Sequence, residues 1–262
     1  MSLMMDKTAD RSRFQAISEQ EMQTRRDLAA CYRLVAMYGW DDLLATHISA
    51  RLPDEDGREC FLINPVGLMF EEITASSLVK VNIDGEILQE TPYTINRAGF
   101  VIHSAVHAAR ADARCVIHLH TLDGVAVSAM ENGLLPLNQS AIAISRLIAF
   151  HDYEGIATNE QERERLVADL GDKPLMLLRN HGTLAAAPTI PLAFLRIYQL
   201  EWSCSAQVRT LGLGRKLREA SVESIGNTTA IMEAMNLEGY AGSLVWPALL
   251  RKLDRTNPGY AD

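Results

Sequence analysis

One short apolar segment, residues 115–121, carries two histidines two positions apart. It reads Cys115-Val-Ile-His-Leu-His-Thr121 and opens into a turn at Thr121–Gly124. Because side chains alternate faces along a β-strand, His118 and His120 are predicted to point the same way, with Cβ atoms roughly 6–7 Å apart. That separation lets two imidazole nitrogens reach one divalent cation. The segment is therefore predicted to be a strand that presents metal ligands.

A third histidine stands in a matching context about sixty residues later. Residues 175–179 form an apolar run typical of a buried strand, and Asn180-His181-Gly182 follows at once. Loops at strand ends often carry function. Two histidines on one strand and a third at the mouth of another indicate a three-histidine metal site with its fourth position open, as in catalytic zinc centres.

Two other interpretations of these histidines stay open. They fit a set of half-buried side chains that hydrogen-bond to their neighbours. They also fit a structural metal, although such sites usually complete a tetrahedron with protein ligands, and no cysteine or fourth histidine matches the motif.

Length and composition favour a single large domain. The chain has 262 residues, 48% of them hydrophobic, which is enough for a full core. We expect a loosely ordered segment at 1–17, one domain at 18–262, and a helical tail within it from about 215. The net charge is −8 and there is no basic run, so nucleic acid is not an expected partner. Four scattered cysteines and the lack of a long apolar segment predict a cytoplasmic protein without membrane contact.

Hydrophobic periodicity and turn residues predict an α/β chain. The hairpin signal at Asp84-Gly85 and the short spacing between strands argue against a simple parallel repeat. We therefore expect a mixed, mainly antiparallel sheet with helices on both faces. Helices are predicted at 18–39, 96–110, 122–130, 158–171 (with Thr158 as its cap), 191–211, 228–237 and 244–254. Strands are predicted at 43–52, 59–64, 78–83, 86–88, 115–120, near 136–139, 175–179 and 183–187, with a polar loop at 151–155.

Over roughly residues 20–215 the sequence resembles the class II aldolase/adducin family. Its motifs are closer to those of the adducin head domain and its bacterial relatives than to those of the sugar-phosphate aldolases. The matching segments are His47-Ile-Ser-x-Arg51, Ile63-Asn-Pro-x-Gly67, Ile73-Thr-Ala-Ser-Ser77, His103-Ser104, His118-x-His120-Thr, Ala126-Val-Ser-Ala-Met130, His151-Asp-Tyr-x-Gly155, Leu178-Arg-Asn-His-Gly182 and Gln207-Val-Arg-Thr-Leu211. The resemblance implies a three-layer αβα sandwich and a homotetramer with active sites at subunit interfaces.

The resemblance also implies a metal. His118, His120 and His181 fall on the family's three metal-binding histidines. The expected ion is Zn²⁺, with Mn²⁺ or Co²⁺ as alternatives. Its expected role is that of a Lewis acid, which polarises a carbonyl and stabilises the enolate formed when a carbon–carbon bond breaks.

Several positions depart from the sugar-phosphate aldolases. Their acid/base glutamate falls on Gly99, which has no side chain. Two serines that help hold the phosphate fall on Arg97 and Ala98. An asparagine and a threonine of the phosphate loops fall on His47 and Val66. The chain is therefore not expected to be an ordinary sugar-phosphate aldolase.

The remaining polar groups give the candidate substrate and catalytic residues. Ser49 and the Gly67 backbone keep part of an anion site. Arg97 offers a forked donor set suited to a carboxylate, unless it is a solvated helix residue or an ion-pair partner. His47 adds a group that titrates near neutral pH. The expected substrate-binding residues are His47, Ser49, Gly67 and Arg97.

His103 and Tyr153 are candidate catalytic residues, although both also fit packing roles. Glu71 and Glu72 are expected on the surface, from which either could replace the missing acid if their loop folds inward. The predicted function is a metal-dependent carbon–carbon lyase, acting by aldol cleavage or decarboxylation on a small, non-phosphorylated hydroxy- or keto-acid. The alternative is a non-enzymatic, adducin-like scaffold or binding module.

Overall fold

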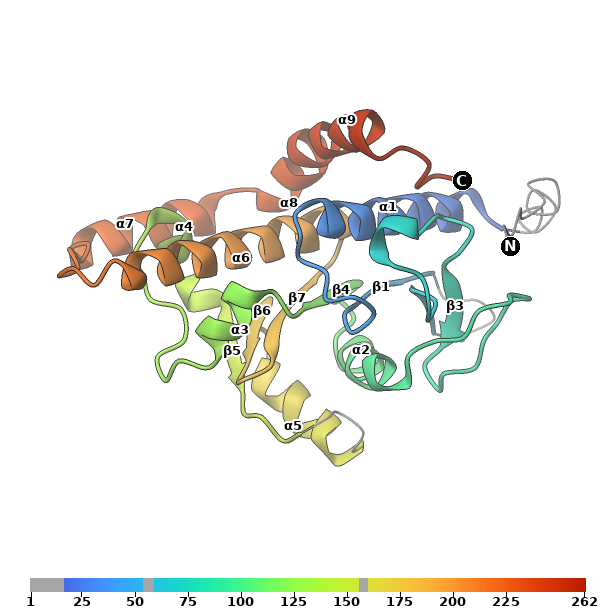
Figure 1. Cartoon of the computed structure of the whole chain (residues 1–262), viewed down its shortest axis with the longest axis horizontal. Helices are drawn as coiled ribbons and strands as arrows, with labels where there is room; N and C mark the ends of the chain where they lie inside the picture. Colours follow the sequence, from blue (N-terminus) through green and yellow to red (C-terminus); the bar gives the residue numbers. More distant parts are fainter. Residues whose placement is uncertain (1–16, 54–58, 156–159) are drawn as a thin grey trace.

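The computed structural model describes residues 17–53, 59–155 and 160–262. Within them a seven-stranded sheet has the order β3-β2-β1-β4-β7-β6-β5 (Figure 1). β5 and β6 pair in parallel, and every other neighbouring pair is antiparallel. The predicted mixed, mainly antiparallel sheet is confirmed. The strands are β1 (His47–Arg51), β2 (Cys60–Ile63), β3 (Val79–Asn82), β4 (Cys115–Leu119), β5 (Ile148–His151), β6 (Leu175–Leu178) and β7 (Gly182–Ala187).

Helices cover both faces of this sheet. The α-helices are α1 (Glu19–Met37), α2 (Arg97–Ala109), α3 (Leu122–Ser128), α4 (Gln139–Ile144), α5 (Glu160–Leu170), α6 (Ile190–Gly212), α7 (Val222–Ala234), α8 (Leu237–Tyr240) and α9 (Trp246–Thr256). The short helical turns are η2 (Phe70–Glu72), η3 (Ser145–Leu147) and the π-helical η4 (Ala241–Val245). None of these helices combines the length and apolarity that a bilayer crossing requires.

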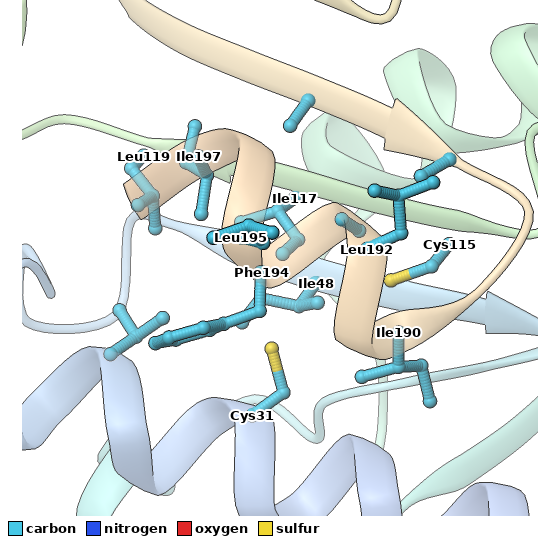
Figure 2. Packing of buried hydrophobic residues seen from close by; sticks show 14 of the residues in the cluster. Cys31, Ile48, Cys115, Ile117, Leu119, Ile190, Leu192, Phe194, Leu195 and Ile197 are labelled. Atoms are coloured by element: carbon cyan, nitrogen blue, oxygen red, sulfur yellow. The ribbon is translucent and has the colours of Figure 1, made fainter. Parts of the chain in front are cut away.

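The alternation of side chains along β4 separates two apolar layers. Ile117 and Leu119 belong to the cluster shared with α1 and α6, whereas Val116 belongs to the cluster shared with α2 and α5. Figure 2 shows the first layer, in which Ile117 and Leu119 lie near Phe194 and Ile197 of α6. His118 has the same parity as Val116 and therefore faces the α2 side. A three-layer αβα sandwich results.

The first and longest helices each begin directly after a capping residue. Ser18 Oγ accepts the Glu21 backbone N–H at 3.1 Å, and α1 begins at Glu19, directly after Ser18. Thr189 caps α6 in the same way, with Pro191 in its first turn. The tail packs back on α1, because Trp246 is buried and its Nε1–H donates to Asp27 at 2.8 Å.

Several predicted elements were wrong. The strand predicted from residue 43 begins only at His47, and Leu43 has a left-handed backbone with φ of 47°. The Glu86–Leu88 strand is reduced to a single bridge between Val81 and Ile87. The segment predicted to begin at 228 begins at Val222, where Ser221 provides a cap. Both the Thr158 cap and residues 1–16 lie outside the described residues.

The most consequential error lies between residues 136 and 151. In place of a strand near 136–139, the Asn138 side chain caps α4 by accepting the Ala141 N–H. Part of the predicted loop at 151–155 belongs instead to β5, which ends at His151. β5 is held by parallel pairing with β6, a contact between distant segments that local periodicity does not encode.

Candidate metal centre

Three histidines converge at one end of β4. His118 lies on β4, His120 follows it directly, and His181 stands in the turn that joins β6 to β7. One ring nitrogen from each lies within 4.8 Å of the others. The Nε2 atoms of His118 and His120 are 2.9 Å apart. We call these three residues the triad.

Hydrogen bonds on the outer side of the triad fix which nitrogens carry lone pairs. His118 Nδ1 donates to the Thr183 carbonyl at 2.9 Å, and His120 Nδ1 donates to Asp42 Oδ2 at 3.1 Å. Each Nε2 of a neutral ring is then an acceptor. Two acceptors that face each other at 2.9 Å have no hydrogen between them, and a shared cation satisfies both. The donor set therefore fits a divalent metal.

His118 and His181 are neutral near pH 7, as metal ligation requires. Burial lowers the pKa of His118 well below its ordinary value, and the nearby His181 and His120 lower it further. Burial, followed by the proximity of His120, lowers the pKa of His181 to about 4. Protons therefore do not compete with a metal for the ring nitrogens of His118 and His181 at physiological pH.

The sequence Asn180-His181-Gly182 accounts for the position of the third ligand. Asn180 has φ of 56°, a left-handed conformation that asparagine adopts more readily than most residues. A Cβ atom on Gly182 would lie 2.3 Å from the Leu119 carbonyl oxygen. Only glycine lets the start of β7 approach β4 this closely, and this approach brings His181 to the other two histidines.

A cavity of about 290 Å³ opens beside the triad. Four of its lining side chains are imidazoles, and in the described part of the chain no carboxylate lines it. Burial, together with the proximity of His120 and His181, lowers the pKa of His47 to about 4, so this ring is also neutral. The lining residues are Ala45, His47, Asn96, Gly99, Ile102, His118, His120, Tyr153, Gly155 and His181.

Of the predicted substrate and catalytic residues, the cavity brings together His47 and Tyr153. The Tyr153 ring centroid lies 6.4 Å from that of His181, and its side chain is 55% exposed. Ser49 and His103 are fully buried behind the cavity, where Ser49 Oγ lies 2.5 Å from His103 Nδ1 and 2.7 Å from His107 Nε2.

The other candidates do not line the cavity either. Arg97 is exposed at the start of α2, and Gly67 forms a turn with φ of 96°. Glu71 and Glu72 are exposed in η2, where Glu72 accepts the Met69 backbone N–H at 2.8 Å. In this structure the loop of these two glutamates does not supply an acid to the cavity.

Sequence reasoning missed a buried carboxylate beneath the triad. Glu201 on α6 is 1% exposed and accepts hydrogen bonds from the hydroxyls of Thr121 and Thr183. Thr121 follows His120, and the Thr183 carbonyl holds His118, so Glu201 links the two strands that carry the triad. Burial raises the pKa of Glu201 to about 7. Helical spacing from the buried Phe194 and Ile197 places residue 201 on the inner face, whereas its neighbour Trp202 is 48% exposed.

Comparison with known proteins identifies the family of the chain. The model of the "Class II Aldolase and Adducin N-terminal domain" matches residues 26–208. A protein of Caulobacter vibrioides with the provisional name aldolase class 2 protein is 54% identical, over 94% of this chain and 95% of its own length. Alpha-adducin of Rattus norvegicus is 45% identical over 75% of this chain, a region that makes up 27% of the adducin.

Solved structures show the same fold. An aldolase II superfamily protein from Pseudomonas syringae superposes with a TM-score of 0.88 at 48% identity, over 94% of this chain and 98% of the other. L-fuculose 1-phosphate aldolase from Glaciozyma antarctica superposes with a TM-score of 0.78 at 24% identity, over 93% and 95%. The second likeness concerns the fold alone. The chain belongs to the class II aldolase and adducin N-terminal domain family.

Proposed function

We propose that this protein is a metal-dependent carbon–carbon lyase that acts on a small, non-phosphorylated hydroxy- or keto-acid. The observation that carries the proposal is the convergence of the triad's lone pairs on a cavity of about 290 Å³. A divalent metal, with Zn²⁺ the preferred ion, supplies a Lewis acid that stabilises the negative charge which aldol cleavage and decarboxylation both leave on the substrate.

The cavity lining supports an acidic substrate. Burial keeps the pKa values of His47, His118 and His181 low, so these rings bear no charge near neutral pH, and none of the described residues that line the cavity is a carboxylate. A bound divalent cation would therefore keep its positive charge, which an anionic substrate neutralises. Gly67, a predicted part of an anion site, and Arg97, the predicted partner of a carboxylate, both lie outside this lining. An acidic substrate would therefore be held by the metal and the cavity lining rather than by Arg97.

The absence of a carboxylate among the described lining residues also favours decarboxylation over aldol cleavage. Aldol cleavage requires a base that removes the proton of a hydroxyl group, whereas release of carbon dioxide requires none. The exposed Tyr153, next to His181 at the rim, is the described side chain best placed to return a proton to the product.

Metal analysis by mass spectrometry, followed by an activity screen, tests this proposal. We expect about one equivalent of zinc or manganese per chain, and its loss in the triple variant His118→Ala, His120→Ala, His181→Ala. The metal-loaded protein should cleave members of a panel of hydroxy- and keto-acids. Turnover of sugar phosphates at ordinary rates, about 1–1000 per second, would contradict the proposed substrate class.

A non-enzymatic binding module is the second candidate, and the 45% identity to alpha-adducin favours it. The two candidates differ in what they require of the triad. A wild-type protein that stays free of metal after zinc is offered would overturn the enzyme proposal and support the binding module.

We also propose a homotetramer in the cytoplasm. All four cysteines are free and buried, which fits a reducing compartment. Leu43 and Leu122, which neighbour the triad-supporting residues Asp42 and Thr121, are 69% and 90% exposed. Contact with further copies of the chain would bury such side chains.

A further inference from the structure

Gly99 and His47 compete for one volume beside the triad. An ideal Cβ atom on Gly99 would lie 2.3–2.5 Å from three atoms of the His47 ring. Gly99 lies in the first turn of α2, and its φ is outside the left-handed region that favours glycine. Space around the residue, rather than its backbone, therefore requires glycine here. The resemblance placed a glutamate at position 99 and an asparagine at position 47. The two differences from the sugar-phosphate aldolases are therefore coupled, because the ring of His47 occupies the space that a side chain at position 99 would need.

His47 is held in this volume by its neighbours. It lies on β1, opposite His118 of β4, and the two rings stack with centroids 6.0 Å apart. Asn96, which also lines the cavity, places its Nδ2 atom 3.3 Å from His47 Nε2. An amide NH₂ is only a donor, so Nε2 is the acceptor and the hydrogen of His47 is on Nδ1.

The Nδ1 atom of His47 is buried without a hydrogen-bond partner among the described residues. A buried donor left unpaired is costly, and because His47 is one of the residues that line the cavity, a ligand oxygen that reached this edge of the ring would satisfy it. A carboxylate oxygen is the stronger partner, because hydrogen bonds to charged acceptors are stronger than those to neutral ones.

We propose that His47 is a substrate-contacting residue and that Gly99 determines specificity by leaving room for its ring. The pair replaces a carboxylate side chain with a neutral N–H donor. The site therefore accepts a substrate that keeps a carboxylate next to its carbonyl carbon, a group that a glutamate at this position would repel. This inference rests on the proposed function and narrows its substrate class to 2-keto-acids in which the bond between C3 and C4 breaks, so that its electron pair passes into the enolate of the C2 carbonyl and the C1 carboxylate is retained.

Thermal melting of four proteins tests the shared volume without reference to activity. Gly99→Ala forces a Cβ into the His47 ring, so the melting temperature should fall by roughly 3–8 °C. Adding His47→Ala to Gly99→Ala removes the ring and opens the space, so the double variant should recover much of the lost melting temperature. Gly226→Ala is the matched control, because nothing lies within 4 Å of that helical position. Gly99→Ala that melts like the wild type would overturn the coupling.

Calorimetric titration of the zinc-loaded proteins with oxalate tests the substrate contact. Oxalate presents a carboxylate next to a second pair of oxygens, as a 2-keto-acid does. We expect His47→Ala and the double variant to bind oxalate at least 10-fold more weakly, with zinc content unchanged. Gly226→Ala should bind oxalate as the wild type does.

The outcomes separate this inference from the proposed function. Wild-type affinity in His47→Ala, or no oxalate binding by the wild type, would overturn the contact. Weakened binding in a protein that cleaves no acid would support the contact and overturn the lyase. If zinc does not bind, the lyase proposal fails, while the melting experiment still decides whether His47 and Gly99 share one volume.

Discussion

Two histidine clusters lie on the same face of the sheet and differ in what stands between their rings. In the triad, the Nε2 atoms of His118 and His120 face each other at 2.9 Å with no hydrogen to share. In the second cluster, the Ser49 hydroxyl stands between His103 and His107, and His107 Nδ1 donates to the Ala113 carbonyl at 2.8 Å.

The difference lies in the direction of the hydrogen bonds. In the second cluster each step has a donor: His107 Nε2 accepts from Ser49, whose oxygen accepts from His103 Nδ1. In the triad, the Nδ1–H groups of His118 and His120 are directed away from the shared centre, to Thr183 and Asp42. Burial lowers the pKa of His103 as it lowers that of His118, so neutral rings alone do not make a metal site. The triad differs in that its lone pairs converge beside a cavity, as the binding of a metal ion would require.

Replacement of Glu201 is expected to have the largest effect, on the pH dependence of the free energy of unfolding. Glu201 contacts the strands that carry the triad and does not contact the second cluster. Its folded-state pKa of about 7 lies above the ordinary 4.5, so the folded protein binds that proton more tightly than the unfolded chain. Its contribution to the free energy of unfolding is therefore full below about pH 4.5 and is lost as pH rises through 7, by roughly 3 kcal/mol.

Urea unfolding of Glu201→Gln between pH 4.5 and 8.5 measures this loss. The neutral amide should remove the dependence, so the variant gains stability relative to the wild type as pH rises. Glu233→Gln, at an exposed position of α7, is the control and should follow the wild type. A parallel pH dependence in Glu201→Gln and wild type would contradict the raised pKa.

Ser49→Ala is expected to have the next largest effect and to distinguish the two clusters. It removes the hydroxyl between His103 and His107 and leaves buried ring nitrogens unpaired, which costs about 1–3 kcal/mol of unfolding free energy. Zinc content should not change, since the triad is not touched. The measurements are chemical unfolding and metal analysis, with the exposed Ser243→Ala as control. Loss of zinc in Ser49→Ala would show that the two clusters are not independent.

Asp42→Asn gives the smallest effect and tests the outward hydrogen bonds of the triad. The amide loses the charge that orients His120 and strengthens it as a ligand, so zinc affinity should fall about 10-fold. Competition with a chromophoric chelator measures this affinity. Asp41→Asn is the neighbouring control, and an equal loss in both variants would indicate a general effect of charge instead of an oriented contact.

The sequence by itself determined which side chains share a face of each strand and which histidines converge. His118 and His120 share a face because side chains on a strand alternate, and Asn180-His181-Gly182 follows a buried run because its residues suit a tight turn. The αβα sandwich followed from such local patterns and from the resemblance.

Only the tertiary structure decided what surrounds those histidines. β5 depends on pairing with β6, Glu201 reaches Thr121 and Thr183 from α6, and His103 lies behind the cavity. The fit of His47 against Gly99 joins positions 52 residues apart. Periodicity reports which face of its own element a residue occupies, whereas a shared volume or a hydrogen bond between elements depends on how distant segments pack.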